Sequence, residues 1–204
     1  ARTVGLAGYT NAGKSSLFHA LSGKKVLVED KLFSTLETTV GRMELSPRIL
    51  LADTIGFIDE LPSDLLDAFH ATLDESLRCD LLLLLADSSD ETSELKRKLS
   101  TSRREVLDRN TGEALHMKVV LTKSDKGGDI EEAQEVVRTM GLPDALVVSS
   151  HIGQGLEELR ESIMYSLYGP KTTLIVSEEN PGQRSAEAYI SQIYDLGIVT
   201  EKND

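Results

Sequence analysis

The chain has 204 residues, of which 40% are hydrophobic and 27% are charged, and these proportions are typical of one globular domain with at most a small appendage. Its 34 acidic residues outnumber its 22 basic residues and give a net charge of -12, which argues against a chain that covers nucleic acid by itself, because neutralising phosphates requires clustered Lys and Arg. With one cysteine, Cys79, and no apolar run near the ~20 residues of a membrane-spanning helix, we expect a cytoplasmic protein without a disulfide partner or membrane insertion.

Short runs rich in Val, Ile and Leu alternate along the chain with polar stretches of helical periodicity, which is typical of βαβ units and a parallel sheet. We expect strands at residues 3–7, 41–45, 49–52, 81–86, 118–122 and 145–148, and helices at residues 14–22, 64–77, 92–109, 130–140 and 156–168. A turn at Pro47 makes the second strand antiparallel to the third. The sequence therefore predicts an α/β fold: a mostly parallel six-stranded sheet with one antiparallel edge strand and helices on both faces.

Two further segments bear on the domain organisation. Residues 24–40 form a long connection, and long connections in compact domains are often functional. The periodic pattern changes after Pro170. We expect a main domain at residues 1–170 and a small C-terminal extension at residues 171–204, which is either a βα unit or a segment docked on the main domain.

The strongest motif is a glycine-rich loop between the first expected strand and the first expected helix. It reads Gly8-Tyr9-Thr10-Asn11-Ala12-Gly13-Lys14-Ser15, followed by Ser16, and satisfies the pattern G-x-x-x-x-G-K-[ST]. In such a loop the backbone N–H groups hold phosphates, Lys14 reaches the terminal phosphates, and the Ser15 hydroxyl binds Mg²⁺. The motif predicts a P-loop NTPase with a three-layer sandwich fold.

A second set of candidate residues follows the third expected strand, as Asp53-Thr54-Ile55-Gly56. Asp53 ends the strand, where a carboxylate holds Mg²⁺ through water, and Gly56 lets a backbone N–H approach a γ-phosphate. A hydroxyl from the long connection would complete the magnesium shell when the γ-phosphate is present. The candidates, which spacing alone does not separate, are Thr35, Thr38 and Thr39.

The base of the nucleotide is expected at the ends of the last two strands. Thr122-Lys123-Ser124-Asp125 closes the fifth strand, and Asp125 can accept hydrogen bonds from the N1–H and 2-amino groups of guanine. Adenine offers no such pair of donors, so the carboxylate would be left unpaired. After the last strand, Ser149-Ser150-His151 supplies a backbone N–H for the base carbonyl. The motifs together predict a guanine nucleotide, GTP or GDP.

These residues resemble the HflX family of ribosome-associated G proteins. Residues 53–73 are similar to that family's switch II and following helix, and residues 32–36 are similar to its switch I. The resemblance implies that Phe33, Ser34 and Thr35 line the nucleotide, that Thr35 is the magnesium-binding hydroxyl, and that the large ribosomal subunit is a partner. It spans residues 4–168 and lacks the family's N-terminal domain and helical linker, so the chain resembles an excised G domain, which we expect to be a monomer.

The sequence departs from the family pattern at two positions, where Thr122 replaces Asn and Ser150 replaces Ala. Signal-recognition GTPases use a similar Thr-Lys-x-Asp, which suggests that guanine selectivity survives with weaker affinity. Many switch GTPases carry a water-orienting Gln where this chain has Phe57. We therefore expect slow intrinsic hydrolysis, on the order of 10⁻³ s⁻¹ or below, that a partner accelerates.

Asn11 resembles an Asn of potassium-activated G proteins, where it helps to hold K⁺ beside the phosphates; the alternative is that Asn11 braces the loop. The candidate catalytic residues are Lys14, Thr35, Gly56 and Asn11. A GTP/GDP-binding module with incidental hydrolysis stays an alternative function, and Asp125 argues against an ATPase or kinase. A basic patch on the third expected helix is more simply a solvated face than an RNA site; it comprises Lys96, Arg97, Lys98, Arg103 and Arg104.

Overall fold

The computed structural model describes residues 1–22, 39–44, 49–53, 56–57, 74, 77–109 and 116–172. Its strands are β1 (Arg2–Gly8), β2 (Thr39–Glu44), β3 (Ile49–Asp53), β4 (Leu81–Asp87), β5 (Met117–Thr122) and β6 (Leu146–Val147). Its helices are α1 (Lys14–Ser22), α3 (Thr92–Arg109), α4 (Ile130–Thr139) and α5 (Leu156–Tyr168), with a 3₁₀ turn, η1 (Ser124–Lys126), after β5.

The six strands form one sheet in the order β2-β3-β1-β4-β5-β6. β2 runs antiparallel to β3, and every other neighbouring pair is parallel. β1 therefore lies between β3 on one side and β4 on the other, so the chain order reverses at β1. Open α/β sheets bind ligands at such a reversal, outside the carboxyl ends of the strands. The predicted fold is confirmed, including the antiparallel edge strand.

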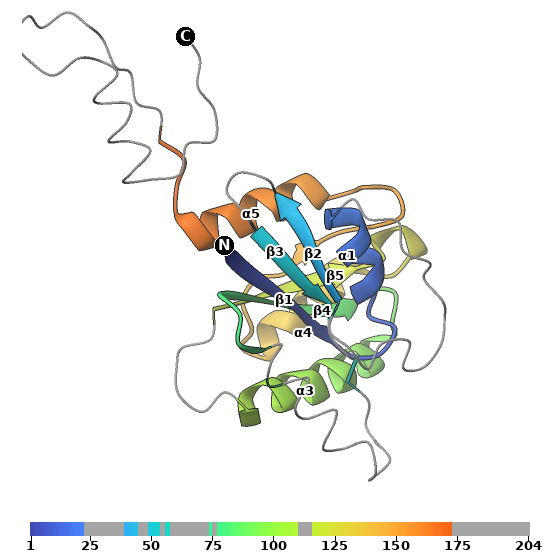
Figure 1. Ribbon diagram of the computed structural model, residues 1–204. Helices are drawn as coiled ribbons and strands as arrows, with labels where there is room; N and C mark the ends of the chain where they lie inside the picture. Colours follow the sequence, from blue (N-terminus) through green and yellow to red (C-terminus); the bar gives the residue numbers. More distant parts are fainter. Residues whose placement is uncertain are drawn as a thin grey trace, which may run out of the picture.

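Helices cover both faces of the sheet: α1 and α5 lie on one face, and α3 and α4 lie on the other (Figure 1). The side chains of β4 alternate between the two faces, because successive residues of a strand point in opposite directions. Leu82 and Leu84 pack toward α3 and α4, whereas Leu83 and Leu85 pack toward α1 and α5. This double burial explains why the strand is apolar at six consecutive positions.

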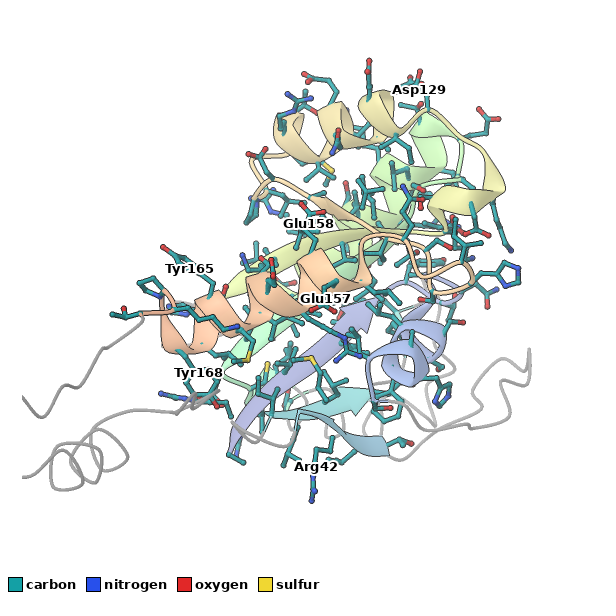
Figure 2. The ribbon with its side chains drawn as sticks, turned by 90° about the horizontal axis from the view of Figure 1, so that it is seen from above. Arg42, Asp129, Glu157, Glu158, Tyr165 and Tyr168 are labelled. Atoms are coloured by element: carbon teal, nitrogen blue, oxygen red, sulfur yellow. The ribbon has the colours of Figure 1, made fainter. Side chains whose placement is uncertain are left out.

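The ends of the helices place their polar residues at the surface (Figure 2). Asp129 caps α4 by accepting a hydrogen bond from the Glu132 N–H at 3.0 Å, which satisfies one orphan donor of the first turn. Glu157 and Glu158 lie in the first turn of α5, where the helix dipole favours negative charge. Tyr165, near the other end of α5, is 63% exposed.

Several predicted bounds differ from the structure by one or two residues. β2 begins at Thr39 rather than at residue 41, because the pairing of β2 with β3 continues to Thr39, which lies opposite Asp53. β3 and β4 each extend by one residue to an aspartate, Asp53 and Asp87, and β6 is two residues long instead of four. The expected helix at residues 64–77 lies outside the described residues except for residues 74 and 77, which are both helical. Residues 24–38 of the expected long connection at 24–40 and residues 173–204 of the expected extension at 171–204 also lie outside them.

Among the helices that the structure describes, none combines the length and the apolar character needed to cross a lipid bilayer.

Candidate nucleotide-binding site

The loop from Gly8 to Ser15 connects β1 to α1 at the point where the sheet order reverses. Gly8 has a φ of 154°, and a side chain there would collide with the carbonyl oxygen of Leu85 on β4. Gly13 has a φ of 84° and Asn11 has a φ of 62°, a region that Gly adopts without strain and that Asn tolerates better than most residues. The motif residues therefore allow the tight turns by which the loop leads from β1 into the N-terminus of α1, where backbone N–H groups favour an anion.

Lys14 begins α1 and is 7% exposed. Its Nζ donates to the carbonyl oxygens of Gly8, at 3.2 Å, and Tyr9, at 3.1 Å, so the ammonium lies across the loop. Burial lowers the pKa of Lys14 to about 8; Asp53 opposes this shift and Lys123 adds to it. An ammonium that is poorly solvated and donates to two neutral carbonyls gains strongly from an approaching phosphate.

Ser15 and Asp53 meet beside this ammonium. The Ser15 Oγ donates to Asp53 Oδ2 at 2.7 Å, and Asp53 is 4% exposed. The parallel pairing of β1 with β3, in register at Leu6 and Asp53, brings the carboxylate to the same sheet edge as the loop. A hydroxyl and a carboxylate are the hard oxygen ligands that Mg²⁺ prefers, together with phosphates and water, so this pair fits a magnesium ion. Among the described residues no cluster of three or more His, Cys, Asp or Glu offers another metal site.

Gly56 and Phe57 are joined to the loop by backbone hydrogen bonds. The Phe57 N–H donates to the Gly8 carbonyl at 2.9 Å, and the Thr10 N–H donates to the Phe57 carbonyl at 2.8 Å. A Cβ on Gly56 would lie 2.7 Å from Lys14 Nζ and 2.9 Å from the Thr10 Cα, which explains why this position is glycine. The side chain of Phe57 is fully buried among core residues that include Ala7 and Leu82. Phe57 therefore anchors this segment in the core.

Thr122 connects residues 122–125, the expected base-recognition segment, to the loop at residues 8–15. Its Oγ1 lies 2.8 Å from the Ala12 carbonyl oxygen and 3.1 Å from that of Ala86, and the residue is 2% exposed. Its own carbonyl accepts from the N–H and the Oγ of Ser88, at 3.0 and 2.7 Å. The threonine at this departure from the family pattern thus has a structural role, in which one buried hydroxyl holds three chain segments together.

Asp125 and Ser149 are in direct contact. The Ser149 Oγ donates to Asp125 Oδ1 at 2.5 Å, and the same Oγ accepts from the N–H groups of His151 and Ile152, at 3.2 and 3.3 Å. The hydrogen bond from Ser149 is the main reason that the pKa of the exposed Asp125 lies below its usual value. Asp125 is therefore ionised at neutral pH and acts as an acceptor of hydrogen bonds.

Asp87 is a residue that our sequence analysis missed. Its Oδ2 binds the Nζ of Lys123 at 2.5 Å, and its Oδ1 accepts from the N–H and the Oγ of Ser89 at 3.0 and 2.6 Å. Burial favours the neutral carboxyl, but the hydrogen bonds from Lys123 and Ser89 outweigh it and lower the pKa of Asp87. The signal was available, because Asp87 follows a buried parallel strand directly, as Asp53 does.

Tyr9 attaches the phosphate-binding loop to α3. The Arg97 guanidinium lies 5.1 Å and the Lys98 ammonium 5.7 Å from the centre of the Tyr9 ring. Arg97 also pairs with Glu94 at 2.7 Å, and Lys98 pairs with Asp90 at 2.9 Å. These two members of the predicted basic patch are therefore engaged within the protein, which supports the solvated-face interpretation over an RNA site for this part of the patch.

The remaining candidate residues divide into two groups. Asn11 and Ser16 are exposed beside the loop, and Ser150 and His151 follow Ser149 at the base end. The other group lies outside the described residues and comprises Phe33, Ser34, Thr35, Thr38, Thr54 and Ile55.

A protein-family model described as "50S ribosome-binding GTPase" matches residues 3–123. The chain is also similar to curated proteins called "GTPase HflX". It is 44% identical to that of Gluconacetobacter diazotrophicus over 98% of this chain and 43% of the relative. It is 35% identical to that of Escherichia coli over 82% of this chain and 39% of the relative. The chain therefore spans about two fifths of the length of the curated relatives it matches.

Among solved structures, the chain resembles a GTP-binding protein from the hyperthermophilic archaeon Sulfolobus solfataricus in complex with GDP. The TM-score is 0.67 at 29% identity, and the match covers 81% of this chain and 52% of that protein. The G-domain of FeoB from Methanococcus jannaschii has a TM-score of 0.58 at 21% identity, covering 81% of this chain and 97% of that domain. The second likeness supports the fold alone.

Proposed function

Because the chain belongs to the 50S ribosome-binding GTPase family, and within it to the HflX GTPases, we propose that it binds GTP and hydrolyses it slowly to GDP and phosphate, as a switch that acts on the large ribosomal subunit. One observation carries this proposal: the buried Lys14, the Ser15–Asp53 pair, Gly56 and the Asp125–Ser149 pair lie at one edge of one sheet.

The phosphate end of the site supplies binding and charge neutralisation. The N–H groups where the loop enters α1, from Gly13 to Ser15, hold the phosphate oxygens, and Lys14 exchanges its carbonyl partners for the terminal phosphates. Ser15 and Asp53, with Thr35 from the switch I segment, would hold Mg²⁺, which neutralises charge that develops on the β- and γ-phosphates. The N–H of Gly56 binds the γ-phosphate, so Gly56 senses whether GTP or GDP is bound.

The base end supplies selectivity. An ionised Asp125 accepts the N1–H and 2-amino hydrogens of guanine, and Ser149 fixes the carboxylate for this contact. The loop at Ser150 and His151 donates a backbone N–H to the base carbonyl. The hydrogen bond from Thr122 to the Ala12 carbonyl holds the base end of the site at a fixed position relative to the phosphate loop. This contact supports guanine selectivity although position 122 carries Thr in place of the family's Asn.

Hydrolysis depends on positioning because Phe57 contributes no polar group to the site. Lys14 and the backbone of Gly56 stabilise charge at the γ-phosphate, and slow turnover follows from the lack of a water-orienting side chain at position 57. Asn11 is exposed at the mouth of the loop, where its side chain would help to hold K⁺ that offsets charge in the transition state. Equal rates in potassium and sodium buffers would contradict this role of Asn11.

Two measurements test the proposed function. Competition against fluorescent GDP should show displacement by GTP and GDP but not by ATP; displacement by ATP with equal affinity would refute the guanine assignment. Single-turnover hydrolysis of GTP should be slow alone and faster with purified 50S subunits. If the subunits leave the rate unchanged while binding depends on the nucleotide, the chain is a GTP/GDP-binding module with incidental hydrolysis, which is the alternative function.

A further inference from the structure

Lys123 has an unusual backbone for its residue type. Its φ of 58° and ψ of 34° lie in the left-handed region, which costs free energy for residues other than Gly, Asn and Asp. The Lys123 carbonyl accepts one local hydrogen bond, from the Lys126 N–H at 2.9 Å. The turn η1 begins at the next residue and contains Asp125. The conformation of Lys123 therefore sets the direction in which the base-recognition segment leaves β5, and something must offset its cost.

The turn after β4 supplies that compensation. Lys123 Nζ forms an ion pair with Asp87 Oδ2 at 2.5 Å, between side chains that are 24% and 12% exposed. The other oxygen of Asp87 is fixed by the N–H and Oγ of Ser89, so the carboxylate has little rotational freedom. A partly buried ion pair with fixed geometry is stronger than a surface pair.

The turn after β4 also holds the backbone of Thr122, the residue before Lys123. Ser88 donates twice to the Thr122 carbonyl, and β4 and β5 are in register at Asp87 and Thr122. Asp87 and Ser88 thus fix the side chain of Lys123 and the residue before it, whereas neither belongs to a nucleotide-binding motif.

We propose that Asp87 is a positioning residue for guanine recognition: it holds Lys123 in its left-handed conformation and thereby keeps Asp125 aimed at the base. This inference rests on the proposed function. Without the carboxylate, Lys123 relaxes toward right-handed backbone angles, the turn that carries Asp125 shifts, and the contact with the 2-amino group of guanine is weakened first.

The chain offers a matched control in the same turn. Asp90 pairs with Lys98 at 2.9 Å with side chains 16% and 20% exposed, so Asp90→Asn removes an ion pair of similar burial that joins the turn to α3 rather than to Lys123. Comparing Asp87→Asn with Asp90→Asn separates an effect on guanine recognition from a general loss of stability.

The experiment measures dissociation constants of GDP and of IDP, which lacks the 2-amino group, for the full chain by competition with fluorescent GDP. For Asp87→Asn we expect GDP affinity to fall about tenfold and the GDP-to-IDP preference to shrink, whereas Asp90→Asn stays within about twofold of the unaltered chain. The melting temperature should change by a similar amount in Asp87→Asn and Asp90→Asn. An unchanged preference in Asp87→Asn, or an equal loss in Asp90→Asn, would overturn the inference.

A double-mutant cycle tests the route through Lys123. Lys123→Gly adopts the left-handed backbone without strain, so adding Asp87→Asn to it should cause no further loss of GDP affinity. Equal losses in both backgrounds would show that Asp87 acts elsewhere. If Asp87→Asn does not fold, Ser89→Ala tests the same carboxylate and should also reduce the preference for GDP; an unchanged preference would overturn the inference. Failure of the unaltered chain to bind GDP would instead refute the proposed function.

Discussion

The phosphate end and the base end of the site are held in place by different kinds of interaction. The loop at residues 8–15 is fixed by glycine conformations and backbone hydrogen bonds around the buried Lys14. The base-recognition segment is fixed by side chains, since Thr122, Lys123 and Asp125 each bind a partner on another element. Backbone contacts tolerate substitution better than side-chain contacts, so affinity at the phosphate end should depend on few residues and selectivity at the base end on several.

The largest effect is expected at the phosphate end. Lys14→Ala removes the buried ammonium, and GTP affinity should fall about 10³-fold, because each hydrogen bond from a charged group contributes about 1.5–3 kcal/mol. Equilibrium binding of fluorescent GTP measures this loss, and circular dichroism of the nucleotide-free variant shows whether the fold persists. A folded variant with undiminished affinity would contradict the assignment of the loop.

Asp125→Asn should cause the next largest loss of GTP affinity, and it should also change which base is preferred. The amide cannot accept both guanine donors, so GTP affinity should fall about 100-fold, while affinity for xanthosine triphosphate, whose 2-oxo group accepts a hydrogen bond, should rise. Competition of the two nucleotides against one probe gives the ratio. If both affinities fall together, the base lies elsewhere.

Thr122 tests the connection between the two ends. Thr122→Val keeps the shape but removes the hydroxyl near Ala12 and Ala86; the buried carbonyls lose a donor, and GDP affinity should fall about tenfold. Thr122→Ser retains the hydroxyl and should bind almost as the unaltered chain does. Equal affinities of the valine and serine variants would show that the hydroxyl is dispensable.

The smallest expected effect is a pH dependence. Phosphates bind the protonated Lys14, whose pKa in the nucleotide-free chain is about 8, and bound phosphate raises that pKa. Affinity is therefore almost fully present at pH 7 and is lost as the pH rises through 8, by about fourfold between pH 7 and pH 8.5. Binding of GTP across this range measures the slope, and Lys14→Arg, which stays charged, is the control. The same slope in both would assign the dependence to another group.

The sequence predicted the two ends of the site unequally well. Glycine spacing specifies the phosphate loop because its shape is local, and the positions of Asp53 and Asp125 follow from the rule that parallel strands end at one edge. The partners of Thr122, Ala12 and Ala86, lie 110 and 36 residues away in the chain, and no local pattern encodes such pairs. The position of Asp87 could have been found from the end of its strand, but its pairing with Lys123, 36 residues away, is likewise encoded by no local pattern.

The most direct test of the account is a crystal structure of the chain grown with GDP and Mg²⁺. We predict phosphate oxygens within hydrogen-bond distance of the N–H groups from Gly13 to Ser15, the metal beside Ser15 and Asp53, and the guanine 2-amino group at Asp125. A nucleotide bound at another place, with this loop and Asp125 making no contact to it, would contradict the account.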